Sequence, residues 1–205
     1  FQMLDGINEH HVVVNTNVVP KDYGSTRSVP KKKRLDTVSA SMIVRYILDN
    51  FTRAKQAVEY IRDYVTVYFP KALHDLEYEC HYMVADLTST YVLEFVRNEA
   101  VVIDISNKPY MTNFFIYGVN FNDDGTVYTP ETQDDIHNAM ATNLITERGS
   151  GLERYNYSAN NYSTADNVEG MRAVLEGLKY TSAYLSSEHV SNPYWYTEFV
   201  GSRGL

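Results

Sequence analysis

Residues 77–115 constrain the fold more than any other part of the sequence, because they indicate two short strands joined by a turn and then a third strand. In the second strand two sets of side chains alternate, Tyr91, Leu93 and Phe95 against Val92, Glu94 and Val96. This period of two predicts a half-buried strand. We expect His81, Glu94 and Asn113 at strand ends, where a side chain is held more rigidly than on a loop. These positions are the first candidates for a functional site.

Helices are predicted on both sides of this region. Apolar residues recur at helical spacing from Ser39 to about Tyr64, and again within 133–145 and 167–178. A β-branched run at 10–19, closed by Pro20, predicts a strand that leads into a basic loop. Helices and strands follow one another in separate runs, which favours a layered α+β fold. The 205 residues suffice for one core, so we expect a single domain over 1–205.

Composition narrows the classes of function. Charged residues make up 21% and hydrophobic residues 44% of the chain, as in a globular soluble protein. The sequence shows no bilayer-spanning apolar run and no targeting segment, so we expect a cytoplasmic protein with no membrane partner. A formal net charge of -8 opposes binding to a phosphate backbone, so we expect no nucleic-acid partner. The basic cluster at 31–34 is interpreted as a solvated loop.

The sequence contains one cysteine, so Cys80 cannot form an internal disulfide or join a cysteine-rich metal site. His81 is its neighbour, but successive side chains of a strand point to opposite faces and cannot act together as nucleophile and base. We therefore interpret Cys80 as a small buried residue. The histidines at 10, 11, 74, 137 and 189 show no pair at helical metal spacing, and we expect no metal site.

Five segments, in one order along the chain, resemble the choloylglycine hydrolase and penicillin V acylase family of linear amide C–N hydrolases. The segments are DGINEHHVVVNTNVVP, VRYILDNFTRAKQAVEYI, HYMVADLTSTYVLEF, YMTNF and GSGLERYNY. No single segment is specific, and the resemblance lies in their order and spacing. It implies the four-layer αββα fold of N-terminal nucleophile hydrolases, represented here by its central part.

The resemblance also implies roles for particular residues, without a cofactor. In the family an N-terminal cysteine attacks an amide carbonyl, and the acyl-enzyme is then hydrolysed. By resemblance Asn113 is an oxyanion donor, and Arg154, in the GSGLER loop, favours the thiolate and can orient a carboxylate. Asn17 is a candidate second donor, although an ungapped match places Val18 there. Without the resemblance, Asn113 would be interpreted as a strand cap and Arg154 as a surface residue. If the resemblance holds, Asn113 and Arg154 should converge on one cleft.

The cysteine that the family places before the DGINE segment is not in this sequence, which leaves several hypotheses open. One is a hydrolase of bile-salt or penicillin-V-like acyl amides whose nucleophile lies outside this sequence. A second is a non-catalytic module, or pseudoenzyme, that binds a small-molecule acyl amide. A third is one fragment of a processed enzyme. Because a fold that lacks terminal strands has open sheet edges, we expect self-association into a homo-oligomer.

Overall fold

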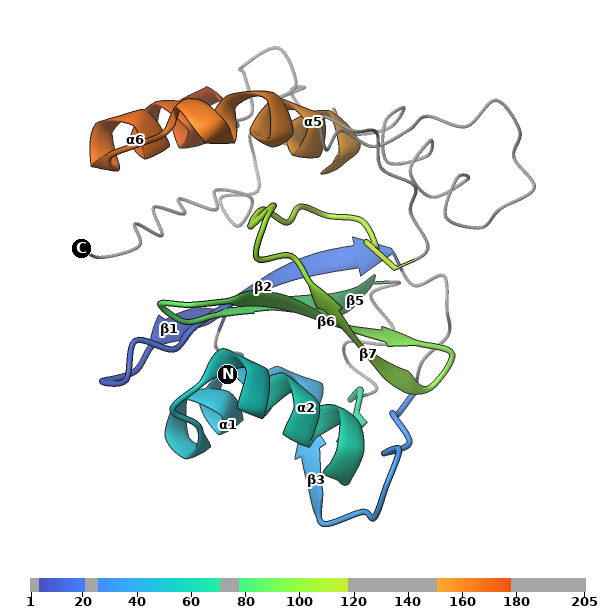
Figure 1. The fold of residues 1–205 in the computed structure, drawn as a ribbon. Helices are drawn as coiled ribbons and strands as arrows, with labels where there is room; N and C mark the ends of the chain where they lie inside the picture. Colours follow the sequence, from blue (N-terminus) through green and yellow to red (C-terminus); the bar gives the residue numbers. More distant parts are fainter. Residues whose placement is uncertain (1–3, 21–25, 71–77, 118–150, 178–205) are drawn as a thin grey trace, which may run out of the picture.

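The computed structural model describes residues 4–20, 26–70, 78–117 and 151–177. Its strands are β1 (Asp5–Ile7), β2 (Val13–Pro20), β3 (Asp36–Ser39), β4 (Val65–Tyr68), β5 (Tyr78–Ala85), β6 (Thr90–Val96) and β7 (Glu99–Asp104). Its α-helices are α1 (Ile43–Asn50), α2 (Ala54–Tyr64), α5 (Gly151–Asn161) and α6 (Val168–Gly177). An antiparallel sheet of order β1-β2-β5-β6-β7 lies between α1 and α2 on one side and α5 and α6 on the other (Figure 1). Strands β3 and β4 form a separate parallel pair.

Strand register sorts the side chains of this sheet onto two faces. Directly paired residues share a face, and Tyr82 is paired with Leu93. Both are completely buried, in the same core as Ile43, Ile47 and Ile61 of α1 and α2. The helix face of the sheet therefore holds the main apolar core, and we call the opposite side the site face.

Polar side chains line the site face. Asn17 of β2 is paired with His81 of β5, and the same register places Glu94 of β6 opposite His81. His81 and Glu94 lie inside their strands, so their predicted position at strand ends is wrong. Asn113 lies beyond β7, which ends at Asp104. The prediction extended β7 too far, because apolar residues continue after the strand as an irregular segment that also packs on the sheet.

Strand β6 is buried over its whole length, so the prediction of a half-buried strand is also wrong. Its helix face contributes Leu93 and Phe95 to the main core. Its site face is covered by residues 105–117, where Val92 packs with Phe114 and Ile116. The alternation indicated the strand correctly, but alternation within one segment does not reveal what will cover its second face.

The predicted helix from Ser39 to Tyr64 is two helices, because the chain becomes extended at Phe51 and Arg53. Phe51 is buried, with 6% of its surface exposed. The Asn8 amide donates to the carbonyls of Leu48, at 3.0 Å, and Phe51, at 2.8 Å. A side chain from the start of the chain thus satisfies carbonyls that the end of α1 leaves without helical partners.

The remaining predictions of secondary structure had mixed outcomes. The strand at 10–19 and the helix at 167–178 are confirmed as β2 and α6. Strands β3 and β4 were not predicted, because each has four residues and β4 directly continues α2. The predicted helix at 133–145 lies outside the described residues.

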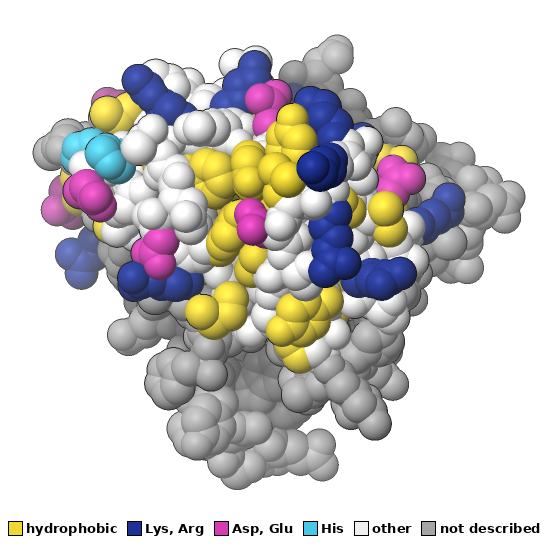
Figure 2. Space-filling model, turned by 90° about the horizontal axis from the view of Figure 1, so that it is seen from below, with side chains coloured by type: hydrophobic (Ala, Val, Ile, Leu, Met, Phe, Trp, Pro, Cys, Tyr) yellow, Lys and Arg dark blue, Asp and Glu magenta, His cyan; other side chains and the backbone are white. Residues whose placement is uncertain are grey.

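Lysine and arginine side chains lie around the margin of the face seen from below the sheet, with several close together on the right (Figure 2). Residues 31–34 are exposed, which confirms the solvated loop. Lys32 still has a partner, because its Nζ lies 2.8 Å from Oδ2 of Asp63. A surface depression is lined by Arg27, Lys32 and Arg34, among others. Within the described residues, no helix is both long and apolar enough to cross a membrane.

Candidate functional site

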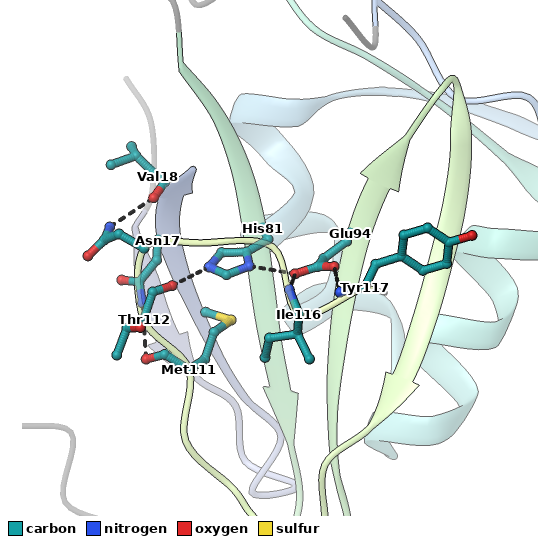
Figure 3. A network of polar contacts seen from close by, with 9 residues as sticks. Asn17, Val18, His81, Glu94, Met111, Thr112, Ile116 and Tyr117 are labelled. Atoms are coloured by element: carbon teal, nitrogen blue, oxygen red, sulfur yellow. Dashed lines mark hydrogen bonds and ion pairs between the residues drawn. The ribbon is translucent and has the colours of Figure 1, made fainter. Parts of the chain in front are cut away.

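Residues 105–117 cross the site face of the sheet without forming a helix or a strand of their own. Their apolar side chains pack on the sheet and on α5, in a cluster of Val92, Ile105, Phe114, Ile116 and Tyr155. Their peptide groups need partners as well, and a sheet offers side chains rather than backbone groups on its face. Polar side chains of the site face supply these partners (Figure 3).

His81 bridges this segment and the neighbouring strand. Its Nε2 lies 2.7 Å from the carbonyl oxygen of Thr112, and its Nδ1 lies 2.9 Å from Oε1 of Glu94. The His81 and Glu94 side chains are both completely buried. A carbonyl oxygen can only accept a hydrogen bond, so His81 must carry a proton on Nε2.

The carboxylate of Glu94 accepts two backbone hydrogen bonds from the same segment. The amide of Ile116 donates to Oε1 at 2.8 Å, and the amide of Tyr117 donates to Oε2 at 2.9 Å. Both oxygens of Glu94 thus accept from backbone amides, and Oε1 also shares a hydrogen bond with Nδ1 of His81. The two side chains form one buried, hydrogen-bonded pair.

Asn113 lies between two partners that fix the direction of its amide. Its Nδ2 donates to the carbonyl oxygen of Val18 at 2.8 Å, and its Oδ1 accepts from Nη2 of Arg154 at 2.6 Å. A guanidinium only donates and a carbonyl only accepts, so this orientation follows from the partners. The second N–H of Nδ2 has no hydrogen-bond acceptor among the described residues. The half-buried amide can therefore still donate to an added ligand.

Arg154 reaches this position from α5, and the structure corrects its predicted place in a loop. The next residue, Tyr155, is 1% exposed, with ring centroids 5.2 Å from Phe114 and 4.8 Å from Tyr110. Burial, and then the nearby Tyr110, raises the pKa of the Tyr155 phenol well above its usual range, so the ring packs as a neutral group. This packing holds α5 beside residues 110–114.

The structure therefore brings together two residues that sequence resemblance had singled out. Asn113 and Arg154 are 41 positions apart, yet their side chains are in contact, as the resemblance predicted. A cleft at this place, and the roles of both residues, stay predictions. Both interpretations made without the resemblance are wrong. Asn113 binds a residue 95 positions away rather than its own backbone, and Arg154 is half-buried.

Asn17 lies at the same side of the sheet. Its Nδ2 is 3.5 Å from the carbonyl oxygen of Met111, a long hydrogen bond. The adjacent Val18, which an ungapped match favoured, has 46% of its surface exposed and contributes its carbonyl oxygen to Asn113. Asn17 thus contacts the segment that carries Asn113, and its role as an oxyanion donor stays a prediction.

Cys80 lies on the other side of the sheet. It is 5% exposed and belongs to the core that packs against α1 and α2, whereas His81 faces the opposite way. The interpretation of Cys80 as a small buried residue is confirmed. Across the described residues, His, Cys, Asp and Glu side chains form no group of three that could hold a metal ion.

The role of the pair formed by His81 and Glu94 was not predicted from the sequence. A signal for it was present, because the two residues lie at equal distances from the turn between β5 and β6 and so become partners once that hairpin is in register. The sequence alone did not show that their common face would be covered by a segment with unpaired peptide groups.

Comparison with known protein families shows to which family this chain belongs. A family model for acyl-coenzyme A:6-aminopenicillanic acid acyl-transferase matches residues 1–189. The chain belongs to this family. The relationship to the choloylglycine hydrolase and penicillin V acylase group, which the five segments predicted, is thereby confirmed. Comparison with curated proteins gave no match.

Solved structures support the fold. Two variants of conjugated bile acid hydrolase from Clostridium perfringens match with TM-scores of 0.57 and 0.59, at 14% and 16% sequence identity. Each match covers 88% of this chain and 60% of the solved chain. The predicted α+β class is confirmed, and the fold is similar to that of these hydrolases, whereas the four-layer αββα arrangement stays a prediction. This chain spans about 60% of the length of those hydrolases.

Proposed function

We propose that this chain is part of an acyl-amide C–N hydrolase in which Asn113 donates a hydrogen bond to the oxyanion of the tetrahedral intermediate. The observation that supports this proposal most is the contact between Nη2 of Arg154 and Oδ1 of Asn113, at 2.6 Å. It turns the amide nitrogen away from the guanidinium, so that an N–H of Asn113 remains available to a substrate.

An asparagine amide suits this role because it donates without carrying a charge of its own. The positive charge of Arg154 on Oδ1 withdraws electron density from the amide and strengthens its N–H groups as donors. Val18 holds one of these N–H groups through its carbonyl oxygen, and thereby directs the other. A donor that is already in place needs no reorganisation when the carbonyl oxygen becomes negative.

The nucleophile in this proposal is an N-terminal cysteine that is not among the 205 residues. Cys80 is the sole cysteine of the sequence. Its side chain is 5% exposed and lies on the side of the sheet that packs against α1 and α2, away from Asn113. The thiolate would attack the amide carbonyl, the amine would leave with a proton, and water would hydrolyse the resulting thioester. If an amine replaced water, as the acyl-transferase name of the family suggests, the product would be a new amide.

A second candidate function is a non-catalytic module that binds an acyl amide. Such a module needs no nucleophile, and Cys80 lies on the side of the sheet opposite to Asn113. The amide of Asn113 would then bind a ground-state carbonyl. The two proposals differ in what the Asn113 contact achieves, because a donor that serves catalysis must act more strongly on the transition state than on the bound substrate.

Kinetics of Asn113→Ala in the complete protein test the proposal, with a glycine-conjugated bile salt and penicillin V as substrates. We expect kcat to fall by roughly 100-fold to 1000-fold with KM changed little, as when one oxyanion donor is removed. Asn107→Ala is the matched control, because Asn107 is exposed in the same segment. Full turnover by Asn113→Ala would refute the proposal. A loss of ligand binding, in a protein without any turnover, would favour the binding module.

A further inference from the structure

We propose that the buried pair of His81 and Glu94 is a positioning device, which holds residues 112–117 on the sheet and thereby sets the direction of the Asn113 amide. This inference rests on the proposed function of Asn113. It assigns no contact with substrate to either residue, because both side chains are completely buried.

The positions of the contacts along the chain support this role. His81 binds the carbonyl oxygen of Thr112, the residue immediately before Asn113, at 2.7 Å. Glu94 binds the amides of Ile116 and Tyr117, shortly after it. The irregular segment is thus held on both sides of Asn113 by a single pair of side chains. These contacts come from β5 and β6, adjacent strands in the middle of the sheet.

The chemistry of the pair explains why ionisable residues stand here. An apolar side chain at either position would remove the hydrogen bond to the Thr112 carbonyl or those to the two amides. Loss of the partner of a buried polar group costs about 1–3 kcal/mol. The two ring nitrogens of His81 form hydrogen bonds in two directions, one to Thr112 and one to Glu94. The two oxygens of Glu94 accept from two amides and also reach His81, so one pair of side chains serves both ends of the segment.

Two substitutions of similar size can remove the two hydrogen bonds of His81 separately, the one to Thr112 and the one to Glu94. The side-chain nitrogen of asparagine reaches about as far as Nδ1 of histidine, and that of glutamine about as far as Nε2. His81→Asn therefore keeps a donor to Glu94 and releases Thr112. His81→Gln keeps a donor to Thr112 and leaves Glu94 without its partner. If the position of Asn113 depends on the contact with Thr112, His81→Asn should be less active than His81→Gln. His81→Gln should be the less stable of the two proteins.

The experiment compares these two variants in the complete protein by steady-state kinetics, thermal melting and amide hydrogen exchange. We expect kcat of His81→Asn to fall roughly tenfold to 100-fold with little change in KM, because small displacements of a catalytic group have effects of that size. Exchange in residues 112–117 should accelerate in His81→Asn more than in a control variant. His81→Gln should melt at a lower temperature than His81→Asn and turn over faster.

Asp63→Asn is the matched control. Asp63 is also a buried carboxylate in ion pairs, with Lys32 at 2.8 Å and Arg62 at 2.7 Å, but it lies in α2 on the other side of the sheet. It should lower the melting temperature and leave both kcat and exchange at 112–117 unchanged. A kcat that simply follows melting temperature across all three variants would overturn the proposal, and so would unchanged exchange at 112–117 in His81→Asn.

Failure of the two proposals gives different results. If Asn113→Ala retains full turnover, the proposed function is wrong, and accelerated exchange in His81→Asn would still establish that the pair holds the segment. If Asn113→Ala is inactive while His81→Asn retains full turnover, the function stands and the positioning role is overturned.

Discussion

In the proposed site, Arg154 would act through the direction of its donors rather than through charge alone. Its guanidinium is a planar group with several N–H donors, one of which meets Oδ1 of Asn113. A lysine at this position would present a strongly hydrated point charge on a shorter, more flexible stem. The Asn113 amide would then lose its fixed partner, although the net charge of the site would stay the same.

We therefore predict that Arg154→Lys lowers kcat of the complete protein by roughly tenfold or more, because the polarising contact on Asn113 is weakened. Steady-state kinetics measure this directly. Arg172→Lys is the control, since Arg172 is exposed on α6, and it should retain normal turnover. If Arg154→Lys has the kcat of the unmodified protein, charge alone suffices and the directional argument fails.

The sequence predicted roles for residues that stand in a recognisable motif. It did not predict roles that depend on contacts with residues far away in the sequence. Asn113 and Arg154 could be proposed because each stands in a recognisable short segment. The pair of His81 and Glu94 could not be interpreted, because its role depends on the peptide groups of a segment that follows β7. The contacts of His81 and Glu94 depend on how residues 105–117 cross the sheet, and this path cannot be predicted from the pattern of residues within one segment.

Among the elements, α2 shows how a helix end can depend on a distant part of the chain. Its first amide, that of Ala54, donates to Oδ2 of Asp86 at 2.9 Å, across 32 positions of sequence. Asp86 stands just after β5 and also accepts hydrogen bonds from Thr88 and Ser89. One carboxylate thus ties the turn between β5 and β6 to the start of α2.

This contact predicts a pH-dependent stability. Burial disfavours the ionised form of Asp86, but hydrogen bonds from Thr88, Ala54 and Ser89 outweigh it and lower the pKa to about 2. An unfolded aspartate has a pKa of about 3.9. The stabilisation is therefore fully present above about pH 4 and is lost as the pH falls through about 2.

Urea unfolding of Asp86→Asn measures this effect. At pH 7 we expect a loss of unfolding free energy on the order of 1–2 kcal/mol, because the variant keeps an acceptor and loses the charge at the helix N-terminus. The difference from the unmodified protein should shrink as the pH falls from about 4 through about 2 and be lost below that pH. Asp5→Asn, at an exposed position in β1, should show little difference at either pH. A difference for Asp86→Asn that does not depend on pH would contradict the assigned cause.

The break between α1 and α2 shows why the prediction of a single helix over Ser39–Tyr64 was wrong. Helical spacing of apolar residues continues through the break, because both α1 and α2 pack against one sheet face. The break depends on Asn8 and Asp86, which satisfy the end of α1 and the start of α2. Partners that come from other elements cannot be read from periodicity within a segment.

In the whole molecule, the central sheet separates two environments. The face toward α1 and α2 is apolar, whereas the face toward α5 carries Asn17, His81 and Glu94 beneath the segment that contains Asn113 (Figure 1, Figure 3). The α+β class could be predicted from the sequence, whereas the predicted four-layer αββα order is not shown by the described residues, in which helices lie on both sides of one five-stranded sheet (Figure 1). The assignment of each residue to a face needed the register, because a shift of one position exchanges the two sides.

This separation gives a prediction for Cys80, which stands on the apolar side. Cys80→Ala in the complete protein should retain normal kcat and KM, and should lose about 1 kcal/mol of stability or somewhat more, because it removes one buried sulfur atom. The 205-residue polypeptide alone should hydrolyse neither a glycine-conjugated bile salt nor penicillin V above background, because Cys80 cannot reach a substrate at Asn113 through the sheet. Circular dichroism of that polypeptide would establish that it is folded in the assay. Turnover by the 205-residue polypeptide that Cys80→Ala abolishes would show that Cys80 is the nucleophile after all.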